Sequence, residues 1–129
     1  MPAPVPDIQT EADIKLLVDT FYQKVNEDEL LHPVFNGFAH VEWSLHLPIM
    51  YDFWSSILLG SSRYHGRPFP KHMPLPIDAT HFQRWLELFE ATVHELFAGP
   101  KAEEANVRAL NIATMFEYRL RKRDPLSLL

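Results

Sequence analysis

The stretch DATHFQRWLELFEATVHELFAG, residues 78–99, contains the clearest structural signal in the sequence. Its large apolar side chains recur at steps of three and four residues, which is the spacing of one face of an α-helix. These side chains are Phe82, Trp85, Leu86, Phe89, Val93 and Leu96. Asp78 is a favourable N-cap residue, and the pair Gly99-Pro100 is a strong stop signal. The stretch therefore predicts a helix that starts at Asp78, ends at Gly99-Pro100 and buries one face.

Three further segments show the same period in their apolar residues. One begins near Thr10, where Thr10 and Asp13 resemble a capping box. Another runs from about Val41 to Leu59, and the last covers roughly Lys101 to Arg123. Because no segment has a convincing strand pattern, the four helices predict an all-α fold.

The segments between these helices are less regular. Leu31 to Phe38 is expected to be a short connector, because Pro33 and Gly37 interrupt it. Residues 61–77 have no sustained period, and a loop of this length is unusual in a compact domain unless it has a function. Pro48 lies inside the second helix, where its missing N–H is expected to kink the helix or reset its start.

Length and charge predict one soluble domain. The 129 residues suit a single domain over residues 1–129, with residues 1–9 as a flexible tail and residues 124–129 as a short C-terminal tail. The formal net charge of -5 argues against DNA, RNA or an anionic membrane as the main partner, since each favours a basic face. No apolar run approaches the roughly 18–20 residues that a membrane span needs.

The sequence contains no cysteine, and this excludes several kinds of site. Disulfides, thiolate metal sites and covalent attachment of a haem through a CxxCH motif are all ruled out. The N-terminal segment MPAPVPDIQT has neither a basic n-region nor an apolar h-region, so it does not resemble a secretory signal. A cytoplasmic location is the default expectation.

Seven histidines are present, and most are expected to be ordinary, partly exposed residues. His72 differs in its setting, because Pro68, Pro70, Pro74 and Pro76 surround it and reduce the freedom of its backbone. A restrained imidazole suits a single axial ligand to a haem iron. Spacing alone leaves an ordinary histidine as the alternative.

Three residues on helical stripes carry polar groups that need a partner when buried. His46 shares a face with Trp43 and Met50, and Tyr22 and Trp85 lie on the apolar faces of two other helices. Such residues are commonly part of an ordinary core. The alternative is that they line a cavity that holds a small ligand.

Other site types have weaker support. A di-iron four-helix protein needs two Glu-x-x-His pairs and two more carboxylates, whereas Glu29 and His32 provide this spacing once, directly before Pro33. HExxH is absent, because Ala98 follows His94 at the position of the second histidine. No P-loop or GxGxxG motif occurs, and the four glycines are scattered.

The order and spacing of several motifs resemble those of group III truncated haemoglobins, the two-over-two globins of bacteria. The motifs are Phe21-Tyr22-x-Lys24-Val25, Pro33-Val34-Phe35-Asn36, Trp43-x-x-His46, Phe53-Trp54 with Leu58-Leu59-Gly60, Tyr64-x-Gly66-x-Pro68, Lys71-His72 and Phe82-x-x-Trp85-Leu86-x-Leu88-Phe89-Glu90. The resemblance covers about residues 14–120, and the lack of the paired glycines typical of other truncated groups agrees with it. It implies a two-over-two helical sandwich around a haem, with residues 61–77 in place of a longer proximal helix.

The resemblance also implies the residues on the two sides of the iron. His72 matches the proximal histidine that binds the metal. Tyr22 and Trp85 match the distal tyrosine and tryptophan, and His46 matches the distal histidine near the ligand entrance. Met50, one turn after His46, matches an apolar position of the distal wall.

Further positions match residues that contact the haem. Phe35 matches the phenylalanine that packs on the haem face. Tyr64 and Lys71 match partners of the haem propionates, and the charge of Arg67 makes it another candidate. Pro48 departs from the family pattern two residues after His46, so the role of that histidine is left open.

The implied function is reversible binding of O2, CO and nitric oxide by a non-covalently held haem b. The alternative is a haem redox enzyme that detoxifies nitric oxide or peroxide with an external reductase, since the chain contains no flavin or nicotinamide motif. A third alternative is a haem-free helical interaction module, in which Tyr22, His46 and Trp85 would be core residues.

Overall fold

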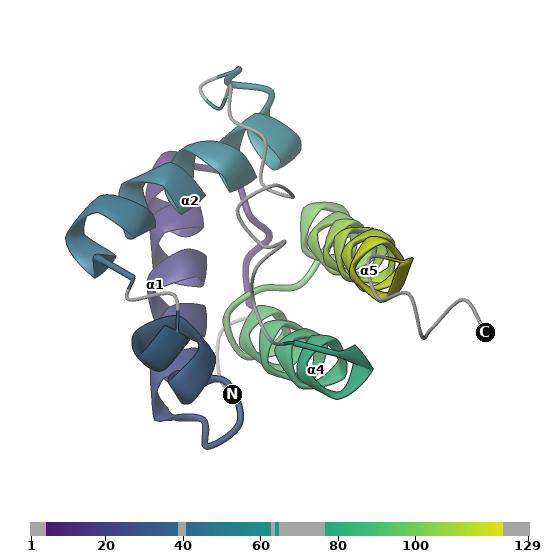
Figure 1. Cartoon of the computed structure of the whole chain (residues 1–129). Coiled ribbons are helices and arrows are strands. Elements are labelled where there is room, and N and C mark those ends of the chain that lie inside the picture. The colour runs from purple at the N-terminus through teal and green to yellow at the C-terminus, as the bar shows by residue number, and fades with distance from the viewer. Residues whose placement is uncertain (1–4, 39–40, 63, 65–76, 123–129) are drawn as a thin grey trace.

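The computed structural model describes residues 5–38, 41–62, 64 and 77–122, and every regular element in these ranges is helical (Figure 1). The elements are α1 (Glu11–Glu27), the short π-helix η1 (Pro33–Phe38), α2 (Trp43–Leu59), α4 (Ala79–Leu96) and α5 (Pro100–Lys122). The predicted all-α class is confirmed.

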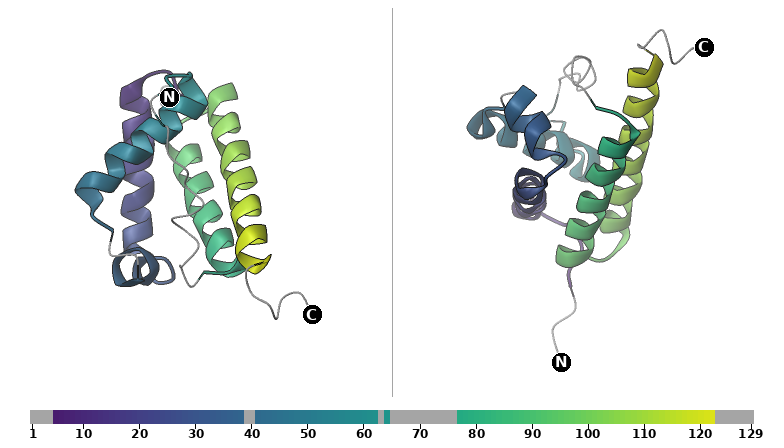
Figure 2. Two further views of the ribbon diagram at one scale, coloured as in Figure 1. Left: turned by 45° about the horizontal axis from the view of Figure 1, so that its top comes forward. Right: turned by 60° about the horizontal axis from the view of Figure 1, so that its bottom comes forward.

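The four long helices form two pairs. Helices α4 and α5 lie side by side, and α1 packs against α2 (Figures 1 and 2). Only residues 97–99 separate α4 from α5, so these two helices run antiparallel. Helix α1 also packs on α4 and thereby joins the two pairs. The arrangement is the predicted two-over-two helical sandwich.

Local sequence signals explain where α1 and α4 begin. The Thr10 hydroxyl accepts a hydrogen bond from the Asp13 N–H at 3.2 Å, and the Asp13 carboxylate accepts one from the Thr10 N–H at 3.0 Å. At the start of α4, the Asp78 carboxylate accepts from the Thr80 N–H at 2.9 Å. These bonds satisfy N–H groups that have no partner within the helix. Both predicted caps are confirmed.

Four predicted boundaries need correction, and the first is the end of α4, which lies at Leu96 rather than at Gly99-Pro100. Residues 33–38 form η1 rather than an irregular connector, and Pro33 is tolerated because a first helical residue needs no N–H bond. Helix α2 begins at Trp43, two residues later than predicted, and continues through Pro48 to its C-cap, Gly60. Helix α5 begins at Pro100, again with proline in the first position.

The segment Pro6 to Ile8 is packed against the rest of the protein. The Asp7 carboxylate accepts hydrogen bonds from the N–H groups of Lys101 and Ala102, at 3.0 and 2.9 Å, and so caps α5. The Pro6 carbonyl accepts from the Ala98 N–H at 3.0 Å, and Ile8 is buried. The prediction of a flexible tail over residues 1–9 is therefore wrong for Pro6 to Ile8.

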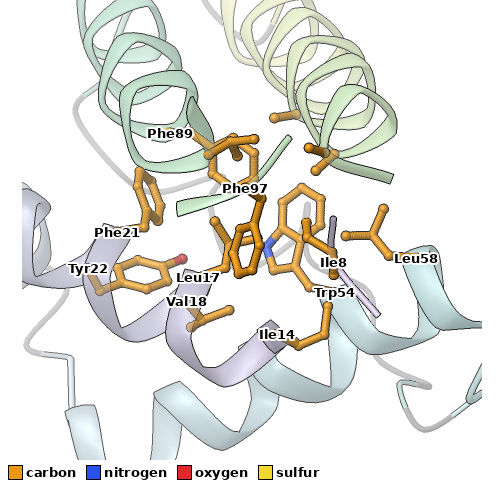
Figure 3. Close-up of a cluster of buried hydrophobic side chains, with 14 of the residues drawn as sticks. Ile8, Ile14, Leu17, Val18, Phe21, Tyr22, Trp54, Leu58, Phe89 and Phe97 are labelled. Atoms are coloured by element: carbon orange, nitrogen blue, oxygen red, sulfur yellow. The ribbon is translucent and has the colours of Figure 1, made fainter. Parts of the chain in front are cut away.

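The core lies where the apolar faces of the helices meet (Figure 3). The stripe predicted for α1 is buried, as are Phe89 and Val93 of α4. Helix α5 contributes mainly small side chains, and Ala105 and Ala109 are fully buried. Small residues on this face allow its backbone to approach the neighbouring helices closely.

A partly buried ion pair connects the end of α1 to α4. The Asp28 carboxylate is 4% exposed and lies 2.6 Å from Nε of Arg84. It also accepts hydrogen bonds from the N–H groups of Leu30 and Leu31. Burial raises the pKa of Asp28, but the bonds from Arg84 and the two backbone groups outweigh it and leave the pKa below its ordinary value.

We expect Asp28→Ala to lower the free energy of unfolding by about 2–3 kcal/mol, because it removes the ion pair and leaves buried N–H groups without a partner. Arg84→Ala should lower the free energy of unfolding by a smaller amount, since Asp28 keeps its two backbone donors. Urea unfolding of the two variants measures this order. A larger loss in Arg84→Ala would contradict it.

The same carboxylate makes stability depend on pH. Because its pKa is lowered by folding, its contribution is present above the ordinary aspartate pKa and is lost as the pH falls through the lowered value, below about pH 4. Asp28→Asn should therefore unfold with a weaker acid dependence than the wild-type protein. Equal acid dependence in the two proteins would contradict this assignment.

Candidate functional site

A cavity of about 110 Å³ lies where α1, η1, α2, α4 and α5 meet. Most of its lining is apolar, and its polar groups come from tyrosine, histidine and tryptophan side chains. The apolar lining residues are Leu31, Val34, Phe35, Met50, Phe53, Ile77, Phe82, Ile112, Ala113 and Phe116. Such a lining favours an apolar ligand and strengthens the few polar contacts that the ligand makes.

The fold brings five of the predicted site residues together around this cavity. They are Tyr22 of α1, Phe35 of η1, His46 and Met50 of α2, and Trp85 of α4. Residues far apart in the sequence thus share one lining. Their contacts with a haem or a gas molecule stay predictions.

Tyr22 lies at the centre of the aromatic side chains on the α1–α2 side. Its ring centroid is 5.4 Å from that of His46 and 6.0 Å from that of Phe35. Burial raises the pKa of Tyr22 far above its ordinary value, so the hydroxyl keeps its proton at any physiological pH. No residue in the described part of the chain hydrogen-bonds to this hydroxyl. It can therefore donate to a ligand in the cavity.

Trp85 lines the cavity from α4 and is fixed by its neighbours. Its indole stacks on Phe89 at a centroid distance of 5.6 Å, and the edge of Phe21 contacts it at 5.5 Å. Within the described ranges, no hydrogen-bond partner engages its N–H. The indole provides a second donor at the same cavity.

Of the remaining predicted site residues, one lies among the described residues and three do not. Tyr64 does not line the cavity, but its ring contacts Phe53, which does, at a centroid distance of 5.1 Å. Burial raises the pKa of Tyr64. His72, Lys71 and Arg67 lie outside the described residues.

Two cavity residues that carry polar side-chain groups, His81 and Trp54, were given no site role from the sequence. His81 lines the cavity from the first turn of α4, with Nδ1 3.1 Å from a carboxylate oxygen of Asp78. The sequence feature that could have indicated the position of His81 is its spacing, because it lies four residues before Trp85 and therefore on the same helix face. Trp54 also lines the cavity and stacks on Phe89 at 4.9 Å, and it is only 3% exposed.

The lining is suited to a haem. A porphyrin presents two broad apolar faces, and aromatic and aliphatic side chains from both helix pairs line this cavity. Ile77, which lines the cavity, is five residues from His72 in the sequence. The donor set contains imidazole, phenol and indole groups and no thiol, which is typical of histidine-ligated haem sites.

Comparison with known proteins agrees with a lining that is suited to a haem. The sequence model of the bacterial-like globins matches residues 7–117, so the chain belongs to the bacterial-like globin family. Membership supports a haem-binding globin function, and globins bind diatomic gases such as O2. None of the described helices is long and apolar enough to cross a membrane.

Within this family the chain is similar to a group 3 truncated haemoglobin. The group 3 truncated hemoglobin ctb of Campylobacter jejuni is 34% identical over 116 residues, which cover 87% of this chain and 91% of that protein. The crystal structure of the group III truncated hemoglobin from Campylobacter jejuni superposes with a TM-score of 0.82 at 32% identity, covering 91% of this chain and 95% of the other. The resemblance inferred from the sequence motifs is confirmed.

Proposed function

We propose that this protein binds O2 and other diatomic ligands reversibly at the iron of a haem held by His72. The observation that carries the proposal is the meeting of Tyr22, Trp85 and His46 in one apolar cavity of a globin fold. Two of these groups are donors without a partner among the described residues. A haem supplies the iron that binds the gas.

The family resemblance indicates which residues would hold the haem. His72 would bind the iron, and Phe35 would pack on the porphyrin face. Tyr64 and Lys71 would contact the propionates, with Arg67 as a further candidate. Because the chain has no cysteine, the haem would be held without a covalent bond, as a haem b.

The chain's own residues would stabilise the ligand in two ways. The apolar lining excludes water, which strengthens hydrogen bonds made inside the cavity. The Tyr22 hydroxyl and the Trp85 N–H would donate to a ligand with partial negative charge. Two such bonds, at about 1–1.5 kcal/mol each, would slow release by roughly one to two orders of magnitude.

Slow release favours a second candidate function. A protein that releases O2 slowly is poorly suited to carrying it, and better suited to oxidising nitric oxide or reducing peroxide. Electrons for such turnover would come from an external reductase, and the setting would be the cytoplasm. Mixing the O2-bound protein with nitric oxide in a stopped-flow instrument, followed by a search for reductase-supported turnover, separates this function from simple binding.

Visible absorption spectra of the ferric, ferrous and CO-bound protein test the proposed function. We expect a Soret band that shifts with CO in the wild-type protein and is weakened or displaced in His72→Ala. His94→Ala is the matched control, because His94 is an exposed histidine of α4 outside the cavity lining. A wild-type protein that takes up no haem when hemin is supplied would overturn the proposal and leave a haem-free helical interaction module.

A further inference from the structure

A second hollow, the outer groove, lies between α1 and α2. It has a volume of about 480 Å³ and is more open than the cavity. Gln23 and Asn26 line it from α1, and Trp43 and Leu47 line it from α2. Tyr22 lines both hollows, so the outer groove and the cavity lie on two sides of one side chain.

Trp43 completes the partition beside Tyr22. Its ring centroid lies 5.3 Å from that of Tyr22 and 5.6 Å from that of His46, and it stacks on Phe35 at 5.9 Å. Those three neighbours line the cavity, whereas Trp43 lines only the outer groove. The indole therefore lies behind the cavity residues, on the side that faces the groove.

A hydrogen-bond network holds the Trp43 indole in this position. Its N–H donates to the side-chain oxygen of Asn36 at 3.0 Å. The amide nitrogen of Asn36 in turn donates to the side-chain oxygen of Asn26 at 2.9 Å and to the His32 carbonyl at 3.2 Å. These bonds fix which end of the Asn36 amide faces the indole. Movement of Trp43 requires its bond to Asn36 to break and its ring contacts with the cavity residues to be given up.

The groove is lined by both charged and apolar side chains. Lys15 and Asp19 form an ion pair at 2.8 Å on the α1 side, and Asp19 also accepts a hydrogen bond from the Tyr51 hydroxyl. Trp43 and Leu47 provide apolar surface in the same groove. An uncharged molecule of two atoms can cross such apolar surface with little desolvation cost, whereas an ion cannot.

We propose that Trp43, held by Asn36, is a gate between the outer groove and the cavity, and that small uncharged diatomic gases reach the cavity through it. The inference rests on the proposed function, because it assigns the route by which that function's ligands enter. Trp43 acts as a positioning residue. Its indole keeps Tyr22 and His46 in place and opens the route when it swings away from Asn36.

Flash photolysis of the CO-bound, haem-loaded protein tests the gate. Trp43→Ala should raise the CO association and dissociation rate constants together, by about tenfold each, because an access barrier affects both directions equally. Trp43→Phe, which keeps a ring but loses the bond to Asn36, should raise both by about fivefold, equivalent to about 1 kcal/mol. Loss of ligand stabilisation would instead change dissociation alone, and that result would overturn the proposal.

A variant that fills the groove should lower the CO rate constants, whereas the Trp43 variants should raise them. Gln23 is exposed and lines the outer groove, so Gln23→Trp should lower both CO rate constants by roughly threefold. Glu90→Trp is the matched control, because Glu90 is exposed on α4 and lines neither hollow. Equal rates in Gln23→Trp and Glu90→Trp would overturn the proposal.

Xenon provides a readout that does not involve the iron. In crystals under xenon pressure, we expect xenon density in the outer groove beside Trp43 in the wild-type protein and its loss in Gln23→Trp. Absence of a haem Soret band in the wild-type protein would mean that the proposed function fails. A normal Soret band with CO rates unchanged in Trp43→Ala would mean that only the gate fails.

Discussion

Replacing Tyr22 by Phe and Trp85 by Leu in one protein is expected to speed O2 release by about one to two orders of magnitude. Each substitution removes a donor that faces the cavity and has no partner among the described residues. The apolar lining keeps water from replacing the lost bonds. Stopped-flow displacement of O2 by CO measures the release rate.

The single variants separate the two donors. Each should speed release by roughly five- to tenfold, and the double variant shows whether the effects add. Tyr118→Phe is the control, because Tyr118 is exposed on α5 and lies outside the cavity lining. An unchanged release rate in the double variant would show that Tyr22 and Trp85 do not stabilise the ligand.

Gly99→Ala is expected to lower the free energy of unfolding by about 3 kcal/mol and the melting temperature by about 10 °C. Gly99 has φ of +137°, a conformation that other residues rarely adopt. A Cβ atom there would lie 2.6 Å from Cγ of Asp7. The variant would displace the carboxylate that caps α5, and thermal unfolding followed by circular dichroism measures the loss.

Gly37→Ala is the matched control for this prediction. A Cβ atom at Gly37 would meet nothing within 4 Å, and its backbone does not have the positive φ of Gly99. We expect its stability to remain within about 0.5 kcal/mol of the wild-type protein. Equal melting temperatures for the two variants would show that Gly99 is not constrained by Asp7.

The helices could be predicted because their signals are local. Thr10 and Asp13 are three residues apart, and the apolar stripes repeat every three or four residues, so neither depends on distant parts of the chain. The packing of Asp7 could not be predicted in this way. Its partners Lys101 and Ala102 are 94 and 95 residues away, and an aspartate near a terminus resembles an ordinary exposed residue.

The candidate site could be predicted only in part. Periodicity placed Tyr22, His46 and Trp85 on buried faces, but a helix face that lines a cavity has the same period as one that packs in a core. Only the family resemblance favoured a cavity lining over core packing for these three residues. His81 and Trp54 were missed because only the tertiary arrangement of the helices shows that both reach the same cavity.

The cap that Asp7 provides has a consequence for folding kinetics. Most contacts in a helical protein join residues close in sequence, whereas the Asp7–Ala102 bond joins residues that are 95 positions apart. We expect this contact to form after the rate-limiting barrier, so that weakening it accelerates unfolding and leaves the folding rate almost unchanged. On this expectation, the bonds of the N-terminal segment lengthen the lifetime of the folded protein without changing the speed at which it forms.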